Sequence, residues 1–410
     1  MPFLYSLAVS VAKAMIPLIA KSTKTKAFVA GRRALWTQLK GISQNKKVVW
    51  MHCASLGEYE QGLPVLTALK NNHPEHFYLV TFFSPSGYQV RKNPGVADLV
   101  TYLPWDTKAD VKRFIAMVNP IMALIIKYEF WPNLIRELQD KRVPLYLIAG
   151  LFRQNQHFFK PWGNSQRKLL RGFTHFFVQN ENSLQLLQSI GVHQVSISGD
   201  TRFDRVGVPK ERLAFMEKFV GNRKCIVAGS TWTEDEVVLA KAIKQTPKDW
   251  CWLIAPHEMH ETKLKYLMAQ LPKESLRYTK SDEAAFEACT VLVLDTVGIL
   301  GRCYPYASLA YVGGGMGTSG LHNILEPAAE GLPIIIGKNY SKFPEAKDLI
   351  AVGGVVSVAN PEDCIEQLSI LQENDTLREE KGNANKNYVL TNQGATVKTL
   401  GLINQNLLMV

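Results

Sequence analysis

The chain has 410 residues, of which 46% are hydrophobic and 20% are charged, and its formal net charge is +11. This length exceeds what one hydrophobic core usually organises, so we expect two domains of roughly 200 residues each. The composition excludes an intrinsically disordered chain. The six widely spaced cysteines form no CxxC pair, which indicates reduced core residues of a cytosolic protein and not a disulfide framework.

The positive charge is concentrated in residues 1–50, which contain no acid. Their basic residues are Lys13, Lys21, Lys24, Lys26, Arg32, Arg33, Lys40, Lys46 and Lys47. The apolar run from Phe3 to Ala20 has about the minimum length for crossing a bilayer and lacks the cleavage site of a removed signal peptide. We predict that residues 1–47 are a membrane-attachment segment that spans the membrane or lies in its surface. A helix of a soluble core is the alternative. Charge gathered in one segment argues against a nucleic-acid-binding groove.

Strand-like apolar runs alternate with amphipathic stretches along the rest of the chain, which predicts an α/β protein with doubly wound parallel sheets. The predicted strands are 48–54, 77–83, 99–103, 121–127, 144–149, 175–178, 195–198, 225–228, 251–255, 291–294, 309–312, 333–336 and 355–358. We divide the chain into an N-terminal domain at 48–205, a linker at 206–222, a C-terminal domain at 223–385 and a C-terminal helix at 386–410. That helix could pack back on the first domain. Ligands are expected at the carboxyl ends of the strands, in a cleft between the domains.

Three candidate side chains follow strands of the first domain. Glu58 lies in a Ser-x-Gly-Glu turn after the first strand, Glu129 follows the fourth strand, and Arg202 lies in the segment that ends the domain. We expect Glu58 to be ionised at pH 7 without an unusual pKa. A helix cap is the alternative for Glu58, and a surface salt bridge is the alternative for Arg202.

The stretch from Ser308 to Gly337 is the most informative part of the second domain. An apolar strand breaks into Gly313, Gly314 and Gly315, and a helix must begin near Asn323 because a proline is tolerated only in a first turn. Such a loop suits a phosphate, and Glu326 could accept hydrogen bonds from ribose hydroxyls. An ordinary strand-to-helix turn is the alternative. Other polar turns follow strands at Ser230, at Pro256 and His257, and at Gly298, Ile299 and Leu300. No metal-binding motif is present, so we predict no metal site.

Together these pieces resemble the 3-deoxy-D-manno-octulosonic acid (Kdo) transferases of lipopolysaccharide lipid A biosynthesis, which have the GT-B fold of two Rossmann-like domains. The matching motifs, in order, are ASLGE, YEFWPN, GDTRFD, GSTWTEDE, DTVGIL, and VGGG followed by HNILEPAAEGLPIIIG. The resemblance implies inverting transfer of Kdo from CMP-Kdo to a lipid A precursor (lipid IVA) at the cytoplasmic face of the inner membrane. It implies neither a cofactor nor a metal, and no nucleic acid as partner.

The resemblance also implies roles for individual residues. Glu58 is the implied general base, and Glu129 and Arg202 stabilise the transition state. The implied CMP-Kdo-binding residues are Ser230, Pro256, His257, Gly298, Ile299, Leu300, Gly314, Gly315, Asn323, Ile324, Leu325 and Glu326.

This sequence departs from the family pattern at three positions. His257 stands where the family usually has arginine, Ile299 where it has glutamate, and Arg202 where it has lysine. The sequence does not determine whether His257 would carry a positive charge at the phosphate, because an imidazole titrates near neutral pH. A GT-B transferase that uses another nucleotide sugar at the membrane surface is the alternative function.

Overall fold

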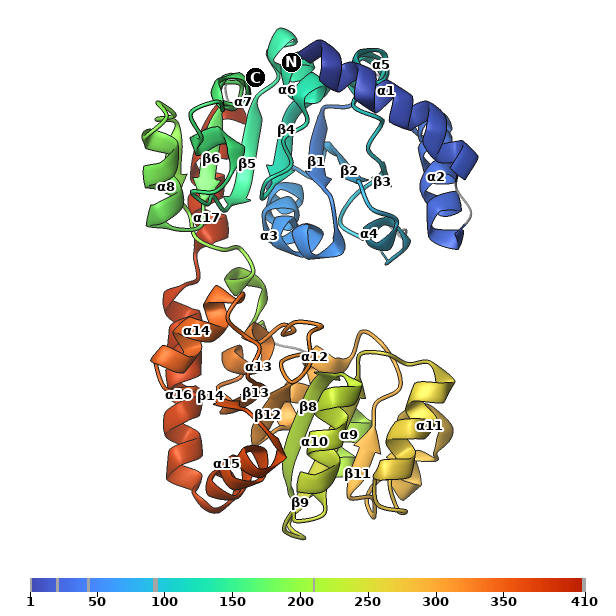
Figure 1. Cartoon of the computed structure of the whole chain (residues 1–410), viewed down its shortest axis with the longest axis vertical. Coiled ribbons are helices and arrows are strands. Elements are labelled where there is room, and N and C mark those ends of the chain that lie inside the picture. The colour runs from blue at the N-terminus through green and yellow to red at the C-terminus, as the bar shows by residue number, and fades with distance from the viewer. Residues whose placement is uncertain (1, 20–21, 43–44, 91–94, 209–210, 408–410) are drawn as a thin grey trace. The chain divides into compact units, whose positions relative to one another are not determined.

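The computed structural model describes residues 2–19, 22–42, 45–90, 95–208 and 211–407. It divides the chain into two compact units: unit 1 comprises Met1–Arg205 and Gln393–Val410, and unit 2 comprises Val206–Asn392. Each unit contains one seven-stranded sheet flanked by helices (Figure 1). Every paired strand runs parallel to its neighbour, which confirms the predicted doubly wound α/β fold.

The sheet of unit 1 has the strand order β3-β2-β1-β4-β5-β6-β7. Its strands are β1 (Val48–Cys53), β2 (Phe77–Phe82), β3 (Leu99–Tyr102), β4 (Pro120–Ile126), β5 (Leu145–Gly150), β6 (His175–Val178) and β7 (Val195–Ile197). Its helices are α1 (Pro2–Ile19), α2 (Thr23–Leu39), α3 (Leu56–Asn72), α4 (Pro85–Val90), α5 (Lys108–Val118), α6 (Pro132–Asp140), α7 (Asn164–Leu170), α8 (Glu181–Gln188) and α17 (Ala395–Leu407). The order reverses between β1 and β4, so the switch point of this sheet lies between the carboxyl ends of those two strands.

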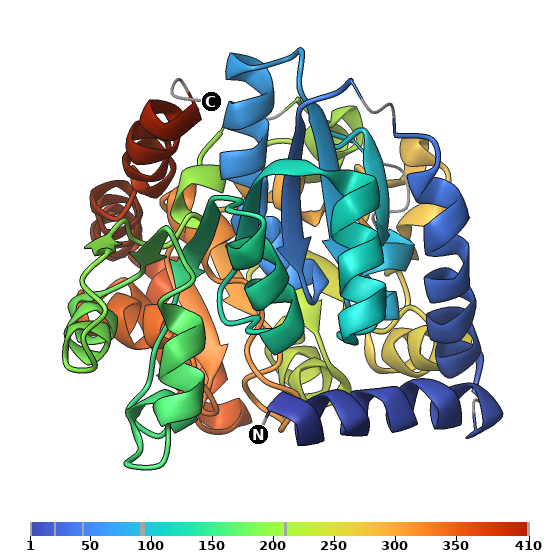
Figure 2. The same cartoon turned by 90° about the horizontal axis from the view of Figure 1, so that it is seen from above.

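Both faces of this sheet are covered, which explains why its strands are nearly continuous apolar runs. Val48 and Trp50 of β1 face a core that includes side chains of α2, α5 and α6. Val49 and Met51 face the opposite core, to which α3 and α17 contribute. Figure 2 shows these layers, with α3 and α17 on one side of the sheet and α5 and α6 on the other.

The two N-terminal helices differ in how they join unit 1. Leu35 and Leu39 of α2 are buried in the core of the unit. Within the predicted membrane-attachment segment 1–47, α2 is therefore a core helix, which was the alternative. Two polar side chains of α1 contact other elements of unit 1: Ser6 is hydrogen-bonded to Asn133 of α6, and Lys13 forms an ion pair with Asp110 of α5 at 2.6 Å.

Five large apolar side chains of α1 are exposed to solvent. Leu4, Leu7, Val11, Met15 and Leu18 have exposed fractions of 47–84%. Their spacing of three and four residues puts them on one stripe of the helix. Within the described residues, no helix combines the length and the apolar character that crossing a bilayer requires.

A buried arginine fixes α2 to the sheet. Arg32 is 4% exposed, donates a hydrogen bond to the carbonyl of Phe83 at 3.1 Å, and lies over the rings of Phe28, Phe83, Tyr102 and Trp105. Burial lowers its pKa to about 9. The aromatic faces therefore compensate part of the cost of burying this cation.

The sheet of unit 2 has the order β10-β11-β9-β8-β12-β13-β14, with its switch point between β8 and β12. Its strands are β8 (Lys224–Thr231), β9 (Trp250–Pro256), β10 (Leu276–Arg277), β11 (Val291–Val293), β12 (Leu309–Val312), β13 (Ile334–Gly337) and β14 (Val355–Val358). Its helices are α9 (Ala214–Val220), α10 (Thr233–Ile243), α11 (Glu261–Gln270), α12 (Leu300–Cys303), α13 (Leu325–Ala329), α14 (Pro344–Ala351), α15 (Pro361–Glu373) and α16 (Asp375–Thr391).

Two boundaries in the structure differ from those drawn on the sequence. The segment 206–222, predicted as a linker, contains α9, which buries Phe215, Met216 and Phe219 in unit 2. These three residues have helical spacing, which the polar residues around them obscure. The C-terminal unit extends through α16 to Asn392, and not to residue 385.

The last helix returns to unit 1. Gly394 has a φ of 99°, and α17 begins one residue later. The carboxylate of Asp204 accepts hydrogen bonds from the backbone N–H groups of Gly394 and Thr396, both at 2.6 Å. Asp204 therefore caps the N-terminus of α17 from a distant part of the same unit.

Candidate active site

The switch point of unit 1 carries the two predicted carboxylates. Ser55 caps α3 by accepting a hydrogen bond from the N–H of Glu58, so Glu58 stands in the first turn of the helix that follows β1. Glu129 follows β4 across the switch point, before α6 begins at Pro132. The structure therefore puts both side chains after the pair of strands where ligands bind in open α/β sheets.

Burial and charge together change the acidity of Glu58. Its side chain is only 6% exposed, and its carboxylate accepts a hydrogen bond from the N–H of Ala54. Burial raises its pKa to about 7, and the negative charge of Glu129 acts in the same direction. The N–H of Ala54 and the positive charge of Lys127 oppose the rise. The expectation of an ordinary pKa was wrong, because the sequence gives no measure of how much water reaches this turn.

Glu129 is linked to His52, a fully buried residue of β1. Nε2 of His52 lies 3.8 Å from the carboxylate of Glu129, whose side chain is 15% exposed. Nδ1 of the same ring lies 2.9 Å from the hydroxyl of Thr81. The ring is thus held by Thr81, while its Nε2 faces Glu129 and has no hydrogen-bond partner among the described residues.

Arg202 forms an ion pair, as the salt-bridge alternative proposed. Its Nε donates to Asp200 at 2.9 Å and its Nη2 lies 2.7 Å from the same carboxylate. Asp200 also accepts a hydrogen bond from Gln61 at 3.2 Å, and the hydroxyl of Thr201 donates to the carbonyl of Gln61. Since Gln61 lies on α3, the turn that carries Arg202 is anchored to the helix that carries Glu58.

In unit 2 the predicted glycine loop follows β12 at the switch point. Gly314 has a φ of 90°, which favours glycine. A Cβ on Gly314 would collide with the carbonyl of Gly320, and one on Gly315 would lie 2.8 Å from the backbone nitrogen of Gly337. These glycines are therefore required for close contact between backbone segments within the loop.

A buried carboxylate that the sequence analysis missed organises this loop. Asp235 of α10 is fully buried, and burial raises its pKa. It accepts hydrogen bonds from the N–H groups of Gly314 at 2.7 Å and Trp232 at 2.9 Å, and from the hydroxyl of Tyr311 at 2.9 Å. The signal was present in the sequence, since Asp235 is the third residue of a helix that follows a strand.

Glu326 belongs to α13, a helix of only five residues that starts close to the predicted position. Asn323 donates to its carboxylate at 3.1 Å and accepts from the N–H of Leu325 at 3.2 Å. A Cβ on Gly301 would lie 2.7 Å from the carboxylate. Because Gly301 directly follows the turn at residues 298–300, the structure brings together two segments that sequence analysis assigned to one ligand.

A stack of aromatic rings lies at the carboxyl ends of β8 and β9. The rings of Trp232 and His257 stack with centroids 4.6 Å apart, and His322 lies 4.4 Å from His257. Burial lowers the pKa of His322 to about 4, with His257 contributing, so its ring is neutral and its Nε2 accepts a hydrogen bond from Trp232 at 2.9 Å. Trp232 was not predicted. Ser230, which was, precedes this stack with a φ of 54°.

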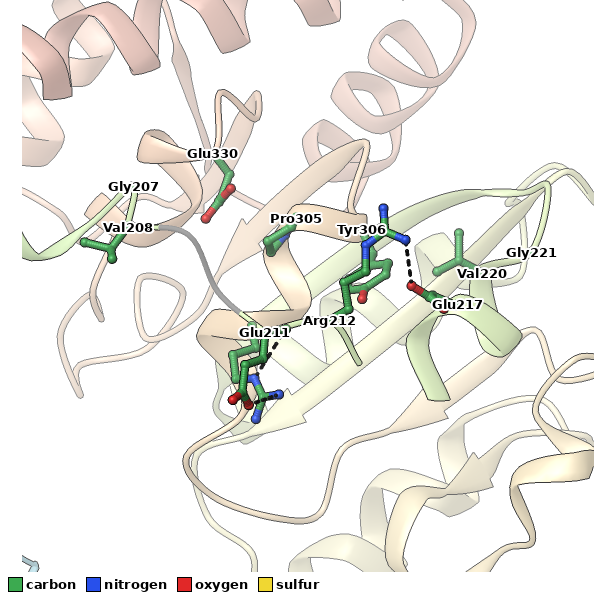
Figure 3. Close-up of a pocket in the computed structure, with 11 residues that line it drawn as sticks. Gly207, Val208, Glu211, Arg212, Glu217, Val220, Gly221, Pro305, Tyr306 and Glu330 are labelled. Carbon is green, nitrogen blue, oxygen red and sulfur yellow. Dashed lines mark hydrogen bonds and ion pairs between the residues drawn. The ribbon is translucent and has the colours of Figure 1, made fainter. Parts of the chain in front are cut away.

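A separate pocket of about 650 Å³ in unit 2 contains none of the predicted residues. Its lining residues are Gly207, Val208, Glu211, Arg212, Glu217, Val220, Gly221, Arg302, Pro305, Tyr306 and Glu330. Figure 3 shows Arg212 directed at Glu217, and Arg302 pairs with Glu211 at 3.2 Å. Both arginines of this pocket therefore have carboxylate partners.

Comparison with known proteins identifies relatives across most of the chain. A family model described as 3-Deoxy-D-manno-octulosonic-acid transferase (kdotransferase) matches residues 29–205. The 3-deoxy-D-manno-octulosonic acid transferase of Haemophilus influenzae is 27% identical over 370 residues, which cover 87% of this chain and 86% of the relative. The transferase of the same name from Aquifex aeolicus is 28% identical over 332 residues, covering 80% of this chain and 86% of the relative.

Solved structures share the fold at lower identity. The UDP-GlcNAc 2-epimerase of Neisseria meningitidis bound to UDP-GlcNAc has a TM-score of 0.61 and 16% identity, covering 87% of this chain and all of the other. MurG of Acinetobacter baumannii has a TM-score of 0.54 and 13% identity, covering 88% of this chain and 99% of the other. These likenesses support the GT-B fold. The family model over residues 29–205 and the sequence relatives show that most of the chain is similar to 3-deoxy-D-manno-octulosonic acid transferases.

Proposed function

We propose that the protein transfers Kdo from CMP-Kdo to a lipid A precursor, with inversion at the anomeric carbon and with Glu58 as the general base. The observation that carries the assignment of the base is a buried carboxylate at the switch point of unit 1 whose pKa is about 7. A base with a pKa near the working pH is effective because it is available in the ionised form and still has a high proton affinity.

In this reaction the hydroxyl oxygen of the acceptor attacks the anomeric carbon of Kdo. The bond from that carbon to the phosphate oxygen breaks, and CMP leaves with the electron pair. Glu58 accepts the proton of the attacking hydroxyl. Such positioned base catalysis typically contributes about 10²–10⁴-fold. Glu129 and Arg202 stabilise the transition state through their charges.

CMP binds in unit 2, at the carboxyl ends of β8, β9 and β12. Glu326 accepts hydrogen bonds from ribose hydroxyls, and its contacts with Asn323 and Gly301 support this role by fixing the carboxylate. The turn of residues 298–300 contributes backbone N–H groups, since Ile299 has no polar side chain. The stack of Trp232 and His257 offers an aromatic surface, which suits a planar nucleobase.

Because the acceptor is a lipid, the enzyme would act at a membrane surface, the cytoplasmic face of the inner membrane. The argument for attachment is the arrangement of α1, whose polar side chains contact unit 1 while its apolar stripe faces outward. If nothing covers this stripe, its apolar surface stays in contact with water, which is unfavourable in free energy. Insertion of the stripe into the lipid interface removes that cost, and the exposed cations Lys26, Arg33, Lys40, Lys46 and Lys47 attract anionic lipid.

The test is an assay of the purified full chain with CMP-Kdo and a lipid A precursor, with the product analysed by mass spectrometry. We expect the acceptor mass to increase by one or more Kdo units, together with release of CMP. A panel of other nucleotide sugars separates this function from the alternative transferase. Turnover of another donor in preference to CMP-Kdo would refute the proposed donor.

A further inference from the structure

Two histidines and a glutamate meet at a turn that the transfer reaction does not use. The sequence His73-Pro74-Glu75-His76 connects the C-terminus of α3 to the start of β2. Glu58 stands near the opposite end of α3, about 22 Å away at 1.5 Å per residue. This turn, which we call the HPEH turn, therefore lies at the amino ends of the strands, away from the proposed catalytic residues.

The backbone of the HPEH turn is held in place by several hydrogen bonds. The N–H of His73 donates to Leu69 at 2.9 Å and the N–H of His76 donates to His73 at 3.2 Å. The hydroxyl of Tyr78, a buried residue of β2, donates to the carbonyl of His73 at 3.0 Å. The side chain of His76 is itself 8% exposed. The two imidazoles are thus positioned by the fold and not by chance contact at a flexible surface.

The ligand atoms of the three side chains lie close together. Nδ1 of His73 and Nε2 of His76 lie 3.8 Å and 3.3 Å from the same oxygen of Glu75, and the three ligand atoms all lie within 4.8 Å of one another. In a tetrahedral zinc site with bonds of about 2.0–2.1 Å, ligand atoms are separated by about 3.4 Å. The two distances to Glu75 are within about 0.4 Å of this value, and the distance between the two imidazole nitrogens, at most 4.8 Å, would adjust on binding.

The ligand atoms of the cluster lie close together without being hydrogen-bonded to one another. Within the described part of the chain, both imidazoles approach Glu75 at ion-pair distances and do not hydrogen-bond to it. Nδ1 of His76 is buried and has no hydrogen-bond partner there either. Nδ1 of His73 and Nε2 of His76 are therefore available to bind a cation.

We propose that the HPEH turn binds a divalent transition-metal ion, represented by Zn²⁺, through Nδ1 of His73, the carboxylate of Glu75 and Nε2 of His76. Two imidazoles and one carboxylate form a ligand set that suits Zn²⁺, with water in the fourth position. The sequence analysis predicted no metal site because the spacing of this turn is not that of a known metal motif. The ion ties the end of α3 to the start of β2 and has a structural role in unit 1, independent of the transfer chemistry.

The test is calorimetric titration of the metal-free full chain with ZnCl₂, compared with three single variants. We expect about one Zn²⁺ per chain for the wild type. Glu75→Gln and His73→Ala should each weaken binding by more than tenfold, since loss of even an outer partner of a metal ligand typically costs about 10–100-fold. His193→Ala removes an exposed histidine of the same unit and is the matched control. It should bind as the wild type does.

Two further measurements separate metal binding from folding. Glu75 is exposed, so Glu75→Gln should melt at the wild-type temperature in EDTA, whereas ZnCl₂ should raise the melting temperature of the wild type and of His193→Ala but not that of Glu75→Gln. Co²⁺ in place of Zn²⁺ should give visible absorption that disappears in both ligand variants. The proposal is overturned if the wild type does not bind Zn²⁺, or if Glu75→Gln and His73→Ala bind it as tightly as His193→Ala does.

Discussion

Replacing Glu58 by glutamine tests the proposed base directly. Glutamine keeps the shape of the side chain and can still accept the hydrogen bond from Ala54, but it cannot accept a proton. We expect turnover at saturating CMP-Kdo and acceptor to fall by about 10²-fold or more, with little change in CMP affinity. The assay is initial-rate measurement of CMP release, with CMP binding followed by calorimetry.

The same substitution has a predicted effect on stability that depends on pH. The pKa of Glu58 rises from 4.5 to about 7 on folding, and at about 1.36 kcal/mol per pH unit this corresponds to roughly 3 kcal/mol. Because the folded-state pKa is raised, the wild type loses this stability as the pH rises through 7, where the buried carboxyl must ionise. Below pH 4.5 the group is neutral in both states and the contribution is fully retained. Denaturant unfolding at pH 5 and pH 8 should therefore show a smaller pH dependence for Glu58→Gln than for the wild type.

Glu60→Gln is the matched control. Glu60 lies two residues along the same helix and forms an ion pair with Arg205, so it has a partner away from the proposed base. The turnover of Glu60→Gln and the pH dependence of its stability should remain close to those of the wild type. The reasoning about Glu58 is refuted if Glu58→Gln retains near-normal turnover, or if it loses activity only together with CMP binding or the fold.

Three further outcomes are expected. Glu326→Ala should weaken CMP binding by roughly 1–3 kcal/mol in calorimetry, because ribose hydroxyls lose a charged acceptor, and unchanged affinity in a folded variant would move the nucleotide site elsewhere. Asp235→Ala should reduce the free energy of unfolding of the chain by roughly 3 kcal/mol, since several buried donors lose their acceptor, whereas exposed Glu234→Ala on the same helix should change it by about 0.5 kcal/mol or less. Removing residues 1–21 should shift the protein from the membrane to the soluble fraction on sedimentation; unchanged sedimentation with membranes would contradict the attachment proposed for α1.

The fold could be predicted because its signals are local. Buried parallel strands are short apolar runs with turn residues after them, and the predicted boundaries of β6, β12 and β14 coincide with those observed. The strand β10 was missed because its two residues are too few for a pattern. The helix α9 was missed for a related reason, since its buried residues Phe215, Met216 and Phe219 are surrounded by polar sequence.

The positions of candidate side chains were predictable, but their environments were not. A carboxylate that follows a parallel strand must lie at the carboxyl edge of a sheet, so Glu58 and Glu129 could be selected from the sequence. Besides burial, the pKa of Glu58 depends on the charges of Glu129 and Lys127, which follow β4 and are distant in the chain. Asp235 illustrates the same limit, since its acceptor role depends on the return of the loop after β12.

The return of α17 to unit 1 has a consequence for how the chain is synthesised. Ile403 completes a core of unit 1 whose other members, apart from neighbouring side chains of α17, precede residue 178. All of unit 2 leaves the ribosome before that residue does. Unit 2 can therefore finish folding during translation, whereas unit 1, although made first, must wait with an apolar face uncovered until the last helix emerges. The order of completion is the reverse of the order of synthesis, and premature termination near the C-terminus would harm the N-terminal unit most.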